Sequence, residues 1–222
     1  MFPYYGRKDR IKKYYPKPEN KKIIEPFAGS APYSLLYWEH DITIVDKYDI
    51  IIEVWKYLQS ASKKDILKLP KIKKDDDIRN FNLSEIERKF MGFCIMHGIV
   101  KPANIVTMFG AQRNGIWWEN KKIQISNDLY KIKHWKFICD DYFTIQNEKA
   151  TWFIDPPYQK EGKAYIHNKI DYEYLARWCK NRKGQVIVCE NIEADWLPFK
   201  PLNKKFQITQ TKKQFKEGIW TN

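Results

Sequence analysis

The order of predicted elements in residues 22–58 constrains the fold of this chain more than any other feature. An apolar run breaks into a turn that contains Gly29, a helix is expected after this turn, and a second apolar run follows. A strand, a helix and a further strand in this order form a βαβ unit, which predicts a parallel sheet. Ser30 is the expected N-cap of the first helix, and Pro32 lies in its first turn. The predicted elements are a strand at 22–27, a helix at 32–40, a strand at 41–46 and a helix at 50–58.

The same alternation resumes at residue 135 and runs to the end of the chain. Residues 59–134 differ, since they begin with a densely charged stretch, contain one clear helix at 83–95 with Ser84 as its N-cap, and look loop-like at 98–120. We therefore expect one Rossmann-like α/β domain with a mainly parallel sheet, made of 1–58 and 135–222, and a small, mostly helical insertion at 59–134. The later elements are strands at 135–139, 152–154, 185–189, 205–211 and 219–222 and a helix at 172–180.

A stiff turn, Asp155-Pro156-Pro157-Tyr158, ends the apolar run 151–154. Each proline lacks a backbone N–H but offers a carbonyl, and the residue before a proline is extended. The turn is therefore rich in hydrogen-bond acceptors, with a carboxylate at one end and an aromatic face at the other. Such a set fits an amino group on a planar ring. A rigid surface turn with a capping Asp is the plain alternative.

An exocyclic ring nitrogen is a poor nucleophile because its lone pair is delocalised into the ring. Two acceptors that hold its two hydrogens favour tetrahedral geometry and the charge that develops on nitrogen. We assign this role to Asp155 and the Pro156 carbonyl, with Tyr158 holding the ring. The nitrogen then attacks a methyl group in line, and a sulfonium methyl donor requires no metal.

A second candidate site is the turn between the first predicted strand and helix. Ligands bind at the carboxyl ends of parallel strands, and Gly29 allows close approach of the backbone. Asp46, at the tip of the next strand, lies where a ribose hydroxyl would bind, and Glu25 adds negative charge near a cationic ligand. The three-glycine dinucleotide pattern is absent, so a nucleoside cofactor fits better than a pyrophosphate. An ordinary helix-start turn is the alternative.

Composition limits the partners of the chain. The formal charge of +13 favours a polyanion such as nucleic acid as a partner, although a Lys-, Ile- and Asn-rich sequence also arises from an AT-rich genome.

The four cysteines form no close pair, and no Cys/His cluster has metal-ligand spacing. No apolar stretch approaches the roughly 20 residues that span a bilayer, and no signal peptide is evident. We expect a metal-free, cytoplasmic protein of a bacterial or phage-infected cell.

Base recognition is a possibility for Gln112, Arg113 and Asn114, which lie between two glycines beside a Trp pair. Arginine and asparagine can contact purine edges in the major groove. A solvated hairpin with packed tryptophans is the alternative.

The chain resembles the Dam-type DNA adenine-N6 methyltransferases, which use S-adenosylmethionine. Several segments in the family's order carry this resemblance. Residues 2–8 resemble its N-terminal cofactor motif, 25–31 its Phe-x-Gly-x-Gly motif, 139–142 the segment before the catalytic strand, 155–158 the catalytic tetrapeptide and 216–222 the final strand. Arg7 and Ala31 depart from it, since each replaces a glycine of the family pattern.

The resemblance implies site-specific methylation of an adenine that is flipped out of double-stranded DNA. It implies a catalytic role for Asp155, Pro156, Pro157 and Tyr158, and target recognition by the insertion. The implied cofactor contacts are Tyr4, Lys8, Glu25, Phe27, Gly29, Asp46 and Asp155. Methylation of an RNA exocyclic amine and non-catalytic DNA binding remain alternatives. The target sequence, the oligomeric state and a role in restriction-modification, phage or orphan methylation stay open.

Overall fold

The structure, a computed structural model, describes residues 1–96, 98–108, 116–202 and 217–222. The chain divides into two compact units. Unit 1 contains Met1–Arg7 and Asp49–Phe137, and unit 2 contains Lys8–Tyr48 and Ile138–Asn222. Unit 1 thus contains the predicted insertion together with the first seven residues and the helix at 49–60, because Phe2 packs against both Trp55 and Phe93. The target-recognition role of 59–134 stays a prediction.

The sheet has seven strands in the order β3-β2-β1-β4-β5-β7-β6. β1 is parallel to β2 and β4, and β4 is parallel to β5, whereas β7 runs antiparallel to both β5 and β6. The predicted α/β class with a mainly parallel sheet is therefore confirmed. The strands are β1 Lys22–Glu25, β2 Asp41–Asp46, β3 Lys136–Cys139, β4 Ala150–Ile154, β5 Gly184–Asn191, β6 Lys200–Pro201 and β7 Glu217–Thr221.

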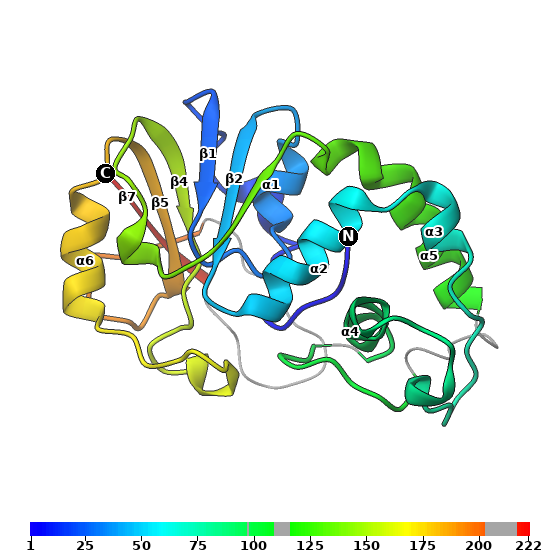
Figure 1. Cartoon of the computed structure of the whole chain (residues 1–222). Coiled ribbons are helices and arrows are strands. Elements are labelled where there is room, and N and C mark those ends of the chain that lie inside the picture. Colours follow the sequence, from blue (N-terminus) through cyan, green and yellow to red (C-terminus); the bar gives the residue numbers. More distant parts are fainter. Residues whose placement is uncertain (97, 109–115, 203–216) are drawn as a thin grey trace. The chain divides into compact units, whose positions relative to one another are not determined.

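Both faces of β4 are covered, because alternate residues of a strand point to opposite faces. Trp152 and Ile154 share a buried cluster with Leu175 of α6 (Tyr172–Lys180), which lies beside the sheet in Figure 1. On the other face, Phe153 stacks on Tyr33 of α1 (Pro32–Leu36), with ring centroids 4.2 Å apart. The apolar run before Asp155 is therefore a fully buried central strand, which fixes where the tetrapeptide begins.

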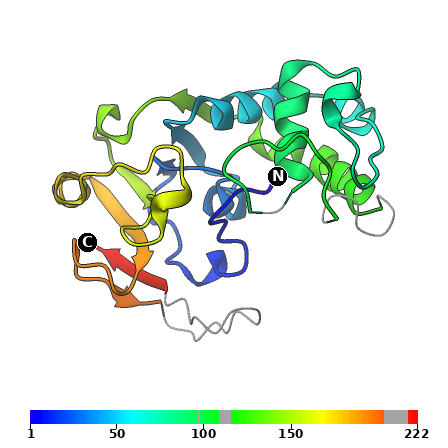
Figure 2. The ribbon, with the colours of Figure 1, turned by 90° about the horizontal axis from the view of Figure 1, so that it is seen from below.

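The direction of β7 brings its first residue to the edge where the parallel strands end. β5 pairs with β7 so that Asn191, the last residue of β5, lies opposite Glu217, the first residue of β7. Figure 2 shows β7 next to the end of β5. Glu217 therefore joins Glu25, Asp46 and Asp155 at one edge of the sheet.

Unit 1 is mostly helical among its described residues. Two of its helices begin with capping boxes, at Ser62 with Asp65 and at Ser84 with Glu87, and the second matches the predicted N-cap. Its elements are α2 Asp49–Ser60, α3 Lys63–Leu67, α4 Glu85–Cys94, α5 Ile116–Asp128, and the 3-10 helices η2 Ile78–Asn80 and η3 Leu129–Ile132. Short 3-10 helices also occur in unit 2, at η1 Lys12–Tyr14, η4 Tyr142–Thr144 and η5 Gly162–Ala164.

Some sequence predictions were wrong. The loop expected at 98–120 is helical from Ile116 onward, because Trp118 and Lys122 are buried and donate hydrogen bonds to the carbonyls of Pro70 and Leu69. The N-cap of α1 is Ala31, not Ser30, and it makes no side-chain cap. The predicted strand at 205–211 lies outside the described residues. None of the helices among the described residues is long and apolar enough to cross a membrane.

Candidate active site

The tetrapeptide 155–158 leaves β4 at the edge where β1 and β5, its parallel neighbours, also end. Two of its backbone carbonyls are engaged: Pro157 accepts a hydrogen bond from the Tyr172 hydroxyl at 2.7 Å, and Tyr158 accepts one from the Gly162 N–H at 2.7 Å. Among the hydrogen bonds of the described residues, none involves the carbonyl of Pro156. This carbonyl is the acceptor that the sequence assigned to a substrate amine.

Gly162 allows the following loop to pack directly on the tetrapeptide. A Cβ atom at position 162 would lie 2.8 Å from the carbonyl carbon and 2.9 Å from the Cβ of Pro157, which is closer than real contacts allow. Glycine is therefore required at this position if the Gly162 N–H is to reach the carbonyl of Tyr158.

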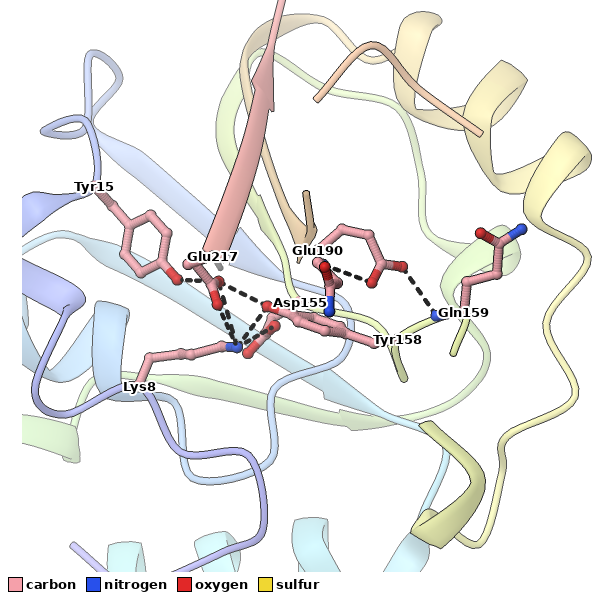
Figure 3. A network of polar contacts seen from close by, with 8 residues as sticks. Lys8, Tyr15, Asp155, Tyr158, Gln159, Glu190 and Glu217 are labelled. Carbon is pink, nitrogen blue, oxygen red and sulfur yellow. Dashed lines mark hydrogen bonds and ion pairs between the residues drawn. The ribbon is translucent and has the colours of Figure 1, made fainter. Parts of the chain in front are cut away.

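Glu190, near the end of β5, holds the residue after the tetrapeptide. Its Oε2 accepts hydrogen bonds from the Gln159 N–H at 3.1 Å and from the Trp196 indole at 3.0 Å, as drawn in part in Figure 3. Burial raises the pKa of the Glu190 carboxyl to about 7. The carboxyl end of β5 thus fixes the chain directly after the tetrapeptide.

Asp155 is an acidic group in a partly buried position, with 22% of its side chain exposed. Burial raises its pKa to about 6, although the Lys8 ammonium, 3.5 Å from Oδ1, opposes this shift. Burial alone would lower the pKa of Lys8, but the charges of Asp155 and Glu217 keep it above its usual range. Lys8 is thus held as a cation beside the carboxylate that begins the tetrapeptide.

Tyr158 is more enclosed than an open stacking surface would be, since only 7% of it is exposed. Its hydroxyl donates to Glu217 Oε1 at 2.7 Å and accepts a hydrogen bond from Lys8, whose Nζ also lies 4.3 Å from the ring centroid (Figure 3). The Lys8 ammonium therefore lies at the hydroxyl end of the ring.

The turn after β1 is organised by Asp46, at the end of β2. Its two carboxylate oxygens accept hydrogen bonds from the N–H groups of Gly29 and Tyr48, each at 2.9 Å. Gly29 and Ala31 both have left-handed backbone conformations, with φ of 48° and 44°. Glycine, the residue of the family pattern at this position, adopts such a conformation easily. Ala31 adopts the same conformation at a cost of roughly 1–2 kcal/mol of folding free energy.

Glu25 ties the same turn to α1. Its Oε1 accepts a hydrogen bond from the Ser34 N–H at 2.6 Å, so it supplies the cap that Ala31 lacks. Burial raises the pKa of Glu25 to about 8 and that of Asp46 to about 6. Within the described residues, the buried Ser30 hydroxyl has no hydrogen-bond partner. The turn thus combines two carboxyl groups with one unused polar group.

The remaining predicted residues lie in several places. Phe27 packs against Tyr142 with ring centroids 5.1 Å apart. Tyr4 belongs to unit 1, where its ring contacts Phe93. The predicted base contacts Gln112, Arg113 and Asn114 lie outside the described residues. Among the residues that the structure describes, no group of His, Cys, Asp and Glu is arranged to hold a metal ion.

The sequence did not point to Tyr15, Tyr172 or Glu217 as site residues. Tyr15 and Tyr158 both donate to Glu217, across 202 and 59 positions of the chain. Such contacts depend on sheet order, which local patterns do not encode. One signal was present for Glu217: it lies in the segment 216–222 that resembles the final strand of the family, two residues before the predicted strand at 219–222.

A family model of the D12 class N6 adenine-specific DNA methyltransferases matches residues 70–217, which include the tetrapeptide. The chain belongs to this family. It is therefore an adenine-specific DNA methyltransferase with a DNA substrate and a methyl donor, and its seven-stranded sheet is consistent with a Rossmann-like methyltransferase fold. Of the alternatives that the sequence left open, membership favours DNA over RNA and an enzyme over a pure binding protein.

Among solved structures, a conserved hypothetical protein of Streptococcus pyogenes is similar over 95% of this chain and 89% of its own, with 10% sequence identity and a TM-score of 0.35. A comparison with curated proteins finds no match.

Proposed function

We propose that this D12-class methyltransferase transfers a methyl group from S-adenosylmethionine to N6 of an adenine flipped out of a specific site in double-stranded DNA. The observation that carries the proposal is the position of Asp155 at the same sheet edge as Glu25 and Asp46. This edge includes the junction of β1 and β4, the kind of strand order change at which open α/β sheets bind ligands.

The turn after β1 fits a cationic nucleoside donor. Asp46 holds the Gly29 backbone and keeps lone pairs for a ribose hydroxyl, because each carboxylate oxygen has two. The carboxyl groups of Glu25 and Asp46 have raised pKa values, so a nearby positive charge would favour their ionised forms. When bound, S-adenosylmethionine supplies a methyl group on a positively charged sulfur. We propose Lys8, Phe27 and Ser30 as further residues that line this site.

Two acceptors would hold the adenine amine. Asp155 and the Pro156 carbonyl accept its two hydrogens, which directs the nitrogen lone pair away from the ring. Pro157 keeps the turn stiff, and its carbonyl is fixed by Tyr172. Tyr158 holds the purine by ring contact.

Flipping follows from the position of the amino group, which is paired inside the duplex. The formal charge of +13 supports attraction to the phosphate backbone. We propose that residues 59–134, with Gln112, Arg113 and Asn114, recognise the target sequence.

Transfer of labelled methyl groups from S-adenosylmethionine to duplexes with adenine tests this function. We expect label on N6 in at least some sequence contexts, and loss of transfer in Asp155→Ala. Asp41→Ala is a suitable control, since it removes an acid at the first residue of β2, at the opposite edge of the sheet. No label on any duplex, genomic DNA included, would contradict the proposal, and an active Asp155→Ala would remove the catalytic assignment.

A further inference from the structure

A cluster of buried polar side chains lies against Asp155, and its centre is Glu217. We call Lys8, Tyr15, Tyr158 and Glu217 the Glu217 cluster (Figure 3). Three segments far apart in the sequence supply it: the N-terminal stretch, the turn after β4 and the start of β7. Glu217 is only 7% exposed, so its charge depends on these partners.

Glu217 has enough partners to be satisfied as a buried carboxylate. Its Oε1 accepts hydrogen bonds from the hydroxyls of Tyr15 at 2.6 Å and Tyr158 at 2.7 Å, and its Oε2 lies 3.4 Å from Lys8 Nζ. A carboxylate offers about four lone-pair positions, so these three contacts are compatible. The position of Glu217 is fixed by the antiparallel pairing of β7 with β5.

Lys8 is shared between two carboxylates. Its Nζ lies 3.5 Å from Asp155 Oδ1 and 3.4 Å from Glu217 Oε1. In the proposed reaction, Asp155 has to accept a hydrogen from the adenine amine, and the Lys8 ammonium competes for the same carboxylate. A second carboxylate that retains Lys8 would free Asp155 for the substrate.

We propose that Glu217 is a positioning residue for methyl transfer, which retains the Lys8 ammonium and the Tyr158 hydroxyl so that Asp155 is available to the adenine amine. This inference rests on the proposed function and goes beyond it, because Glu217 itself touches neither adenine nor donor. It also gives β7 a role in catalysis through Lys8, Tyr158 and Asp155.

The charge of Glu217 has a second, measurable consequence at Asp155. Glu217 is one of the groups that raise the pKa of Asp155, whereas Lys8 lowers it. Without the Glu217 charge, Lys8 would pair with Asp155 alone, and both changes would lower the pKa of Asp155. The titratable groups around Asp155 are Lys8, Tyr15, Glu25, Tyr158, Cys189, Glu190 and Glu217.

The decisive variant is Glu217→Gln, which keeps the shape and removes the charge. We expect the single-turnover rate of N6 methylation to fall roughly tenfold or more at its pH maximum, since misplaced groups cost rate rather than donor affinity. The acid limb of the pH–rate profile should move to lower pH, while the dissociation constant of S-adenosylmethionine, measured by calorimetry, stays within about twofold of wild type. Glu148→Gln, which removes a surface charge paired with Lys22, is the matched control and should leave rate and acid limb unchanged.

Glu217→Asp keeps the negative charge but shortens the side chain, so it separates the effect of the charge from the effect of side-chain length. It also replaces Glu217→Gln as the test variant if thermal unfolding shows that Glu217→Gln does not fold. The shorter carboxylate keeps the charge but cannot hold all three partners, so we expect a slower reaction with the acid limb at its wild-type position. A wild-type rate in either folded variant overturns the inference. A slow Glu217→Gln with an unmoved acid limb also overturns it, since that result indicates a purely structural role. Wild-type protein without N6 transfer would instead overturn the proposed function.

Discussion

At the scale of single residues, Glu25 links the stability of the protein to the site. Its carboxyl group caps α1 through the Ser34 N–H and lies at the edge where Asp155 begins the tetrapeptide. Burial raises its pKa from 4.5 to about 8, so the folded protein holds this proton more tightly than the unfolded chain does. Between these two values, a rise in pH removes stability, because the folded state resists ionisation of the group.

Glu25→Gln should remove this pH dependence while it keeps an acceptor for Ser34. We expect the free energy of unfolding of wild type, relative to the variant, to fall as pH rises from about 4.5 to about 8, by at most about 1.4 kcal/mol per pH unit. Urea unfolding at several pH values across this window measures the difference. Glu148→Gln, at a half-buried site on the surface, is the control and should show no such fall. Parallel curves for wild type and Glu25→Gln would refute the assignment.

The sequence predicted those site residues that belong to contiguous motifs. Asp155 and Pro156 follow a buried strand, and Gly29 and Asp46 follow the first two strands, so their placement at one edge follows from a parallel sheet. The burial of Tyr158 could not be predicted, because it depends on Lys8 and Glu217, which lie 150 and 59 positions away. Local sequence patterns predict which side chains belong to the site, whereas the order of the strands in the sheet determines which distant residues bury them.

At the scale of elements, the start of β5 depends on close backbone contact with β4. Gly184 has a φ of 98°, and a Cβ atom there would lie 2.3 Å from the carbonyl oxygen of Ala150, its partner in the register. This is backbone-to-backbone contact, so no flexible side chain can move aside. The start of the strand that carries Glu190 at its other end therefore tolerates glycine alone.

Gly184→Ala should be strongly destabilising for two reasons, backbone strain at a positive φ and the steric clash with Ala150. Gly98→Ala separates these two causes. Gly98 also has a positive φ, 66°, but a Cβ atom there would have no neighbour within 4 Å. We expect about 1 kcal/mol of destabilisation for Gly98→Ala from backbone strain alone, and at least about 2 kcal/mol more for Gly184→Ala. Denaturant unfolding of both variants measures these values; equal losses would show that the contact with Ala150 relaxes without cost.

Elements with strong local signals agree with the sequence, and elements stabilised by distant contacts do not. β2 and α6 have the predicted limits, since the Asp46 side chain accepts a hydrogen bond from the Tyr48 N–H directly after β2 and the Asp171 side chain caps α6. α5 was missed because its burial depends on hydrogen bonds to carbonyls about 50 positions earlier. β6 has only two residues and depends on β7 for its pairing.

At the scale of the whole molecule, the site is assembled from both ends of the chain. Lys8 and Glu217 meet at Asp155, so the N-terminal segment and the last strand both contribute to one cluster. The sequence predicted a family motif in each of the two segments, at 2–8 and at 216–222, but it did not predict that their side chains would contact one another. An antiparallel final strand explains the meeting, because it begins at the edge where the parallel strands end.

The excess of positive charge should make DNA binding strongly dependent on salt. Each phosphate contacted by Lys or Arg releases counterions, so even about three contacts would weaken binding by more than tenfold between about 50 and 200 mM salt. With a formal charge of +13, we expect a slope steeper than about −3 in a plot of log association constant against log salt concentration. Fluorescence anisotropy with a labelled duplex measures this slope, and calorimetry of S-adenosylmethionine under the same conditions is the control, because a small ligand displaces few ions. A flat plot for DNA would mean that the positive charge plays no part in DNA binding and reflects only the Lys-rich composition that an AT-rich genome produces.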